Sequence, residues 1–280
     1  EFLTDRLTDE AVDFIKANKE KPFFLYFSHY AVHTPLQGKE EYVKHYEPKG
    51  NELDTREVLE KVDSRAYSRI RQSNPVYAAN VQSLDESVDK VMKTLKQLGL
   101  EENTIIVFTS DNGGFSTTKG GTPQMLTSNL PLRFGKGWMY EGGIRVPAIV
   151  KYPKKIESGI KSDQVICGYD FYPTLLSLAG LPLSPNQHID GVDIFNLKPK
   201  EREMYWYYPL KHVSGHTPSA AIRKGDFKLI LDLNTDEVKL YNVKKDISED
   251  RELSVENKEL TLSMKNQLMS FLNKNKPVKK

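Results

Sequence analysis

The chain has 280 residues, of which 38% are hydrophobic and 28% are charged, so it can bury one large core or a large and a small one. Its 40 basic and 38 acidic residues give a formal net charge of +2, and the only notable run of one sign is the basic end from 274 to 280. This balance gives no support to nucleic acid or a membrane surface as a partner.

The start of the chain and its cysteine content add further limits. No apolar stretch approaches the roughly 20 residues that span a bilayer. The chain begins at Glu1 with neither a methionine nor a signal-like apolar segment, so we expect a fragment or a processed product. Its single cysteine, Cys167, excludes an internal disulfide and a cysteine-rich metal site, and the expected role is that of a small buried residue.

The first part of the chain predicts a helix and then a buried strand. Apolar residues recur at helical spacing between Thr4 and Asn18, and a continuous apolar run follows from Pro22 to Ser28. His33 stands just past the end of this run, at the edge where parallel sheets collect functional side chains. A surface or structural role is the alternative for a lone histidine.

The next part predicts a second strand, reached through a long helix. Residues 37–74 are polar and charged and indicate an excursion over the surface. Apolar residues at spacings of three and four from 77 to 98 indicate a helix, with Gly99 at its end. The apolar run from 104 to 109 is a strand in this interpretation. A right-handed βαβ connection would bring His33 and the residues after this strand to one edge of a parallel sheet.

Asp111 and Asn112 follow this second strand directly and are themselves followed by two glycines. A carboxylate beside a carboxamide offers two hard oxygen ligands with one negative charge, which suits Ca²⁺ or Mg²⁺ better than zinc. The alternative is an ordinary Asp-Asn-Gly turn without a ligand, because such sequences are among the commonest turn formers.

The remaining pattern predicts a tight loop and then a smaller antiparallel part. Four glycines and several opposed charges between 131 and 147 indicate a tightly folded loop, with a strand at 146–150 after it. A short helix is expected over 170–180, with Asp170 as its N-cap. Short strands are expected at 204–208, 219–223, 227–231 and 238–242, and a final helix with apolar residues from 260 to 272 is expected to lie on their sheet.

Several separate segments together resemble the sulfatases of the alkaline phosphatase superfamily. They occur in the order of that family across nearly the whole chain, at 33–35, 104–114, 131–147, 170–180 and 221–230. The most specific segment combines LRFGKG at 132–137 with YEGGIRVP at 140–147. The resemblance implies an α/β fold. A mostly parallel sheet flanked by helices, the carboxyl-terminal portion of the catalytic domain, is expected over 1–200, and a small antiparallel sheet plus helix over 201–280.

The resemblance also implies roles for individual residues. Asp111 and Asn112 would be ligands of a calcium ion, Lys136 would contact the sulfate group, and His33 would contact sulfate or the departing oxygen. These roles are chemically consistent, because a sulfate ester builds negative charge on its oxygens and on its leaving group during S–O cleavage. Alone, Lys136 would be interpreted as an exposed lysine; its glycine-flanked position within this motif favours the functional role.

Two parts of the family pattern do not occur in this chain. The family nucleophile is a formylglycine made from cysteine in a Cys-x-Pro/Ala-x-Arg motif, and the calcium site uses an Asp-Asp pair near the start of the domain. Cys167 lacks the following arginine and comes after the metal candidate, so no catalytic role is assigned to it. We therefore expect the nucleophile and half of the metal ligands to lie upstream of Glu1, and the chain alone to be inactive.

His212 and His216 occupy a loop that approaches the substrate in related sulfatases. They are candidates for contacts with sugar hydroxyls or an anionic group, and two surface-loop histidines are the alternative. The resulting prediction is a sulfuric ester hydrolase, with a sulfated carbohydrate as one candidate substrate and a periplasmic or secreted location inferred from the family. The alternatives are a phosphomonoester or phosphonate hydrolase of the same superfamily and a protein that binds sulfated glycans without turnover.

Overall fold

The structure is a computed structural model that describes residues 1–51, 59–63, 66–119, 126–196 and 202–275. Contacts within the chain divide it into two compact units that interleave in sequence. Unit 1 comprises 1–54, 72–109 and 148–195, and unit 2 comprises 55–71, 110–147 and 196–280. These contact-based units are not the two predicted domains, 1–200 and 201–280, because the segment 110–147 groups with the carboxyl-terminal part. The domain division near residue 200 stays a prediction.

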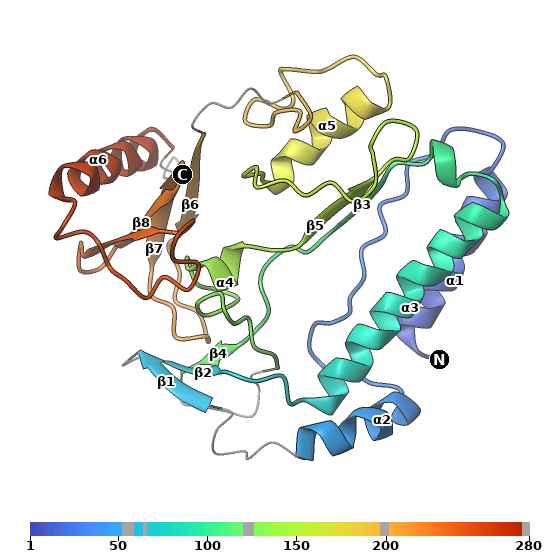
Figure 1. Cartoon of the computed structure of the whole chain (residues 1–280), viewed down its shortest axis with the longest axis horizontal. Coiled ribbons are helices and arrows are strands. Elements are labelled where there is room, and N and C mark those ends of the chain that lie inside the picture. Colours follow the sequence, from blue (N-terminus) through green and yellow to red (C-terminus); the bar gives the residue numbers. More distant parts are fainter. Residues whose placement is uncertain (52–58, 64–65, 120–125, 197–201, 276–280) are drawn as a thin grey trace, which may run out of the picture. The chain divides into compact units, whose positions relative to one another are not determined.

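Unit 1 contains a group of packed helices, α1 (Leu3–Asn18), α2 (Glu40–Asn51) and α3 (Pro75–Gln97). Helices α1 and α3 lie side by side (Figure 1), and Thr8 Oγ1 and Ser87 Oγ form a hydrogen bond of 2.5 Å between them. Helix α3 begins with Pro75 in its first turn, and the Asn74 side chain accepts a hydrogen bond of 3.0 Å from the Tyr77 amide. The positive φ of 71° at Gly99 follows the end of α3, as the sequence predicts.

The strands of unit 1 are β3 (Ile106–Thr109) and β5 (Ala148–Lys151), which pair antiparallel with Phe108 opposite Ile149. Within the described residues, 22–28 form no strand, so the expected strand there is wrong. This run joins none of the sheets formed by the described residues, and Phe24 and Tyr26 are 74% and 81% exposed. Apolar composition indicates that a segment can be buried, but a strand also requires a neighbouring strand to which its backbone is hydrogen-bonded.

Helix α5 (Phe171–Leu178) also lies in unit 1, after a single 3-10 turn over Gly168–Asp170. Asp170 stands at the predicted N-cap and is fully buried, but its carboxylate does not cap α5. Its oxygens accept hydrogen bonds from the Cys167 amide at 2.7 Å and the Val192 amide at 3.1 Å. Asp170 therefore joins two loops. A second 3-10 turn spans Glu101–Asn103 between α3 and β3.

The carboxyl-terminal part of unit 2 is a four-stranded antiparallel sheet with one helix on it. Strands β6 (Glu203–Tyr208), β7 (Ser219–Lys224), β8 (Phe227–Asp232) and β9 (Val238–Asn242) lie in sequence order. Helix α6 (Lys258–Lys274) lies on this sheet (Figure 1). Its Met264 and Leu268 are buried against Ile222, Leu229 and Leu240. The predicted antiparallel sheet and final helix are thus confirmed.

The rest of unit 2 packs on the opposite face of the same sheet. Phe134, Trp138 and Tyr140 form a core cluster with Ala221 and Ile230. A second antiparallel sheet has the order β1 (Leu59–Asp63), β2 (Ala66–Arg69) and β4 (Thr117–Thr118), and α4 (Glu141–Ile144) is a single turn. Among the described residues of both units, none of the helices has the length and apolar character needed to cross a membrane.

Candidate functional site

The segment Ser110–Gly114 folds into a turn that its own side chains close. The Asp111 carboxylate accepts a hydrogen bond of 2.8 Å from the Asn112 amide, and Ser110 Oγ donates one of 3.0 Å to the Asn112 carbonyl. Asn112 Nδ2 donates to the Gly113 carbonyl at 2.9 Å. Asp111 is exposed and Asn112 half-buried, so both side chains are accessible.

The two glycines after Asn112 let this turn approach the loop that contains Lys136. The Gly113 amide donates to the Gly143 carbonyl, and the Lys136 amide donates to the Gly114 carbonyl, both at 3.0 Å. A side chain at Gly113 would overlap the carbonyl of Gly142. Glycine is therefore required here by the close approach of two backbones, and this approach brings Asn112 to the same site as Lys136.

Asn129 holds the two loops together, a role for which the sequence gives no signal. Its carboxamide oxygen accepts from the Gly114 amide at 3.2 Å, while Nδ2 donates to the Gly114 carbonyl at 2.8 Å. The same nitrogen also lies 2.9 Å from the Phe134 carbonyl and 3.1 Å from Ser116 Oγ. One side chain thus adds hydrogen bonds to polar groups of both loops and accepts the hydrogen bond of the Gly114 amide.

The loop from 133 to 145 is tightly folded, as the sequence predicts, and two ion pairs anchor it. Lys228 is fully buried, and its ammonium lies 2.8 Å from Glu141 Oε1 and 2.7 Å from Glu249 Oε1. Both carboxylates are at most 2% exposed, and Glu249 also accepts a hydrogen bond of 2.6 Å from the Glu141 amide. Burial raises the pKa of Glu249, and the charge of Lys228 opposes this shift.

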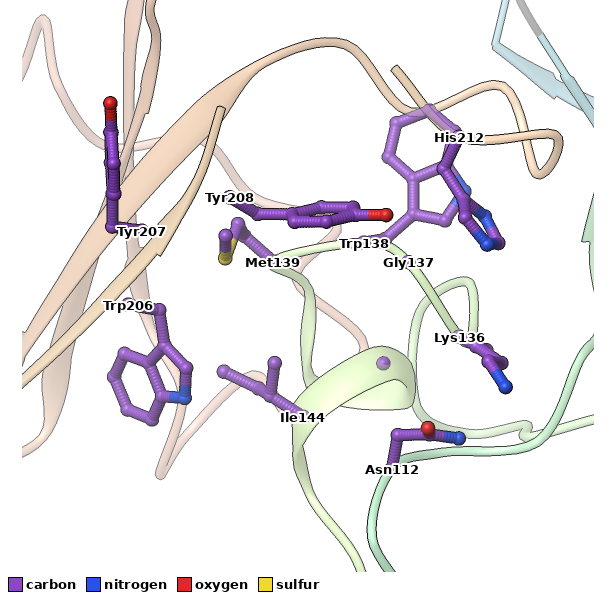
Figure 2. Close-up of a pocket in the computed structure, with 11 residues that line it drawn as sticks. Asn112, Lys136, Gly137, Trp138, Met139, Ile144, Trp206, Tyr207, Tyr208 and His212 are labelled. Carbon is purple, nitrogen blue, oxygen red and sulfur yellow. The ribbon is translucent and has the colours of Figure 1, made fainter. Parts of the chain in front are cut away.

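A cavity of about 300 Å³ lies next to this loop, entirely within unit 2. Figure 2 shows Asn112 and Lys136 on one side of it, with His212 nearby, and Ile144 and Trp206 on the other. The lining residues are Asn112, Lys136, Gly137, Trp138, Met139, Gly143, Ile144, Trp206, Tyr207, Tyr208 and His212. They include one cation and no carboxylate, so the polar end of the cavity is suited to an anion.

His212 lies in this cavity because Gly137 leaves room for it. Gly137 has a φ of 91°, and a side chain there would come within 2.5 Å of His212 Nδ1. Nδ1 lies 3.2 Å from the Ser214 amide, which donates to it, so Nε2 carries the proton of the neutral ring. Burial lowers the pKa of His212, and the positive charge of Lys136 lowers it further, so the neutral imidazole is favoured.

The other two predicted histidines lie elsewhere. His216 is 3% exposed, stacks on Tyr208 at 5.0 Å between ring centroids, and lines a different hollow of unit 2. His33 belongs to unit 1, is exposed, and its Nδ1 lies 2.8 Å from the Thr34 carbonyl oxygen. The structure therefore brings together Asn112, Lys136 and His212, with Asp111 adjacent in the chain, and the roles of His33 and His216 stay predictions.

The donor set of Asp111 and Asn112 fits a calcium ion in kind but not in number. Both side chains are accessible and carry oxygen atoms that can bind Ca²⁺. However, Ca²⁺ is bound by about six to eight oxygen ligands, more than these two side chains supply. No group of three or more His, Cys, Asp or Glu side chains suited to a metal occurs in the part of the chain that the structure describes. These two side chains can therefore supply a minority of a calcium ion's ligands.

Comparison with known proteins agrees with the resemblance. Residues 1–181 match the family described as Sulfatase, and residues 132–275 match N-sulphoglucosamine sulphohydrolase, C-terminal. The chain belongs to the sulfatase family. It is 33% identical to a sulfatase of Formosa agariphila over 98% of this chain and 50% of that protein. It is 32% identical to N-acetylgalactosamine-6-sulfatase of Mus musculus over 81% of this chain and 38% of that protein.

Solved structures give the same result for the fold. The crystal structure of Ps i-CgsB in complex with k-i-k-neocarrahexaose superposes with a TM-score of 0.76 at 33% identity, covering 97% of this chain and 55% of the other. The predicted fold class, alkaline phosphatase-like α/β followed by a small antiparallel sheet and helix, is therefore confirmed. The mostly parallel sheet expected over 1–200 is not observed among the described residues, where the pairs β1–β2, β2–β4 and β3–β5 are antiparallel. The chain spans about half the length of these relatives or less.

Proposed function

We propose that the protein to which this chain belongs is a sulfuric ester hydrolase that releases inorganic sulfate from a sulfated saccharide. The observation that carries the proposal is the cavity in unit 2, where Lys136, Asn112 and His212 form a polar end without any carboxylate. Membership of the sulfatase family and similarity to proteins named for sulfated sugars support the same conclusion. The substrate then places its sulfate at Lys136 and its sugar along the rest of the cavity.

Each of these side chains has a role that follows from its chemistry. The Lys136 ammonium attracts the sulfate oxygens and stabilises the charge that they gain as the S–O bond breaks. The neutral His212 ring, with its proton on Nε2, can donate a hydrogen bond to a sulfate or sugar oxygen. His33 remains the predicted contact to sulfate or to the departing oxygen. A formylglycine nucleophile of the family type would come from outside this chain.

We further propose that Asp111 and Asn112 contribute to a Ca²⁺ site in the complete enzyme. A bound Ca²⁺ would add positive charge beside the sulfate, which favours negative charge in the transition state. The exposed Asp111 carboxylate and the Asn112 carboxamide are hard oxygen donors, as Ca²⁺ requires. Because these are only two ligands, we expect this chain alone to bind Ca²⁺ weakly and to release no sulfate. A periplasmic or secreted location is proposed from the family.

The test is sulfate release by the complete natural protein that contains this chain. We expect multiple-turnover release from sulfated saccharides, loss of this release on calcium chelation, and a loss of at least a hundredfold in kcat/KM for Lys136→Met. Lys211→Met is the matched control, because Lys211 is exposed beside His212 but does not line the cavity.

The same assay separates the alternatives. Release of phosphate from phosphomonoesters or phosphonates in preference to sulfate would favour the phosphatase-like alternative. Binding of sulfated saccharides without release of sulfate would favour a binding protein. Equal activity of Lys136→Met and the Lys211→Met control would contradict the role given to Lys136.

A further inference from the structure

The cavity at Lys136 has a second side that the sulfate-binding role does not use. Opposite the polar end, Met139, Ile144 and Trp206 form an apolar wall (Figure 2). A sulfate ion requires only the polar end, because an apolar wall cannot contact it favourably. The wall must therefore serve the part of the ligand that carries the sulfate, if the cavity serves the function proposed above.

Trp206 occupies this wall because of its position in β6. Side chains alternate along a strand, so Trp206 and Tyr208 share one face and Tyr205 takes the other. Tyr205 stacks on Phe271 of α6 at 4.0 Å between ring centroids and 6° between ring planes, which fixes the direction of the alternation. Trp206 and Tyr208 accordingly pack on the core cluster around Trp138.

The neighbours of Trp206 leave its ring beside the cavity. Its partner across the ladder is Ala221, a small residue that is fully buried, and β6 is the first strand in the sheet order. Trp206 remains half-buried, whereas Trp138 is 4% exposed and its indole N–H donates to Thr117 Oγ1 at 2.9 Å. Both tryptophans line the cavity, and Trp206 is the more exposed of the two.

We propose that Trp206 is a specificity-determining residue on which the apolar C–H face of the sulfated sugar ring packs. A pyranose combines such a face with a rim of hydroxyl groups, and the cavity combines an aromatic wall with hydrogen-bonding groups on Asn112, Tyr208 and His212. Its volume of about 300 Å³ is at the small end of ligand cavities, which suits one sugar ring with its sulfate.

The test is an NMR titration of this chain with three probes: inorganic sulfate, galactose 6-sulfate and unsulfated galactose. The chain has two tryptophans, so two indole N–H signals report separately on Trp138 and Trp206. We expect galactose 6-sulfate to shift the Trp206 signal and inorganic sulfate to shift mainly the amides near Lys136. We expect Trp206→Ala to lower the affinity for galactose 6-sulfate by about 3- to 10-fold and to leave the affinity for inorganic sulfate unchanged.

Two further variants make the result specific. Tyr205→Ala is the matched control, because Tyr205 precedes Trp206 on the same strand, stacks on Phe271 on the other face of the sheet and does not line the cavity. Trp206→Phe keeps an aromatic ring and should retain most of the affinity, which also gives a result if the alanine variant folds poorly.

The outcomes distinguish this inference from the proposed function. If Trp206→Ala and Tyr205→Ala bind galactose 6-sulfate with equal affinity, the role of Trp206 is refuted while the sulfate site stands. The same holds if Trp206→Ala loses as much affinity for inorganic sulfate as for galactose 6-sulfate. If Lys136→Met binds both sulfated probes as tightly as the unmodified chain, the proposed function fails.

Discussion

Replacing Lys228 by methionine removes the ammonium that lies between the buried carboxylates of Glu141 and Glu249 in unit 2. The side chains have similar length, so the main change is loss of charge at a site where Lys228 is 0%, Glu141 2% and Glu249 0% exposed. Glu141 keeps two more distant cations, with Arg145 Nη1 at 3.7 Å and Arg223 Nη1 at 3.9 Å. Glu249 keeps mainly the hydrogen bond from the Glu141 amide.

The expected cost is about 3–5 kcal/mol of the free energy of unfolding near pH 7.5, the range for removing one partner of a buried ion pair. Lys239→Met is the matched control on the neighbouring strand β9. Lys239 is 33% exposed and lies 3.7 Å from the exposed Glu237, so its ion pair should contribute about 0–1 kcal/mol.

The cost should depend on pH with a defined sign. Burial already raises the pKa of Glu249 above 4.5, and removal of Lys228 raises it further. A carboxyl with a raised folded-state pKa contributes stability that is present below its unfolded pKa and is lost as the pH rises through the folded pKa. The deficit of the variant should therefore shrink by up to about 1.4 kcal/mol per pH unit as the pH is lowered from 7.5 towards 5.

Urea unfolding followed by tryptophan fluorescence measures this effect, because Trp138 and Trp206 both lie in unit 2. We expect Lys228→Met to lose a large and pH-dependent part of the free energy of unfolding, and Lys239→Met to lose a small and pH-independent part. Equal losses for the two variants, or a deficit that grows as the pH falls, would refute the interpretation of Lys228 as the neutralising cation. Glu249→Gln should lose less of the free energy of unfolding than Lys228→Met, because Lys228 would keep its ion pair with Glu141.

Three further predictions concern the site itself. Gly137→Ala should cost about 1–3 kcal/mol of unfolding free energy and shift the His212 ring signals, because a φ of 91° is strained for alanine and its Cβ would come within 2.5 Å of His212 Nδ1. NMR titration should give His212 a pKa below 6.5, partly restored by Lys136→Met; His212 thus contributes stability above pH 6.5 that is lost as the pH falls through its lower folded-state pKa. Asn129→Ala should cost about 2–3 kcal/mol in urea unfolding, because it leaves the Gly114 and Phe134 carbonyls without this donor.

The sequence predicts the regular elements where one physical signal dominates. Helix α3 is expected over 77–98 and found over Pro75–Gln97, because the apolar period and the terminal Gly99 agree. The strands β6 to β9 are also found within one or two residues of their predicted bounds. The run from 22 to 28 shows the limit: apolar composition alone does not provide the neighbouring strand on which a ladder depends.

The site is predictable only in part from the sequence. Lys136 and Asn112 could be selected from their motifs, and their glycines explain why the two loops meet. Asn129 and Trp206 could not, because their roles depend on contacts between segments distant in the chain. His212 and His216 illustrate the same limit: they lie four residues apart in one loop, yet one lines the cavity at Lys136 and the other stacks beneath Tyr208.

The most direct test of the central claim is a titration of this chain with inorganic sulfate, followed through the backbone amides of Asn112, Lys136 and Gly137. The cavity geometry predicts saturable shifts at these amides that disappear in Lys136→Met and persist in Lys211→Met. Shifts that are absent, or equal in the two variants, would contradict the assignment of this cavity as the site that receives the sulfate group.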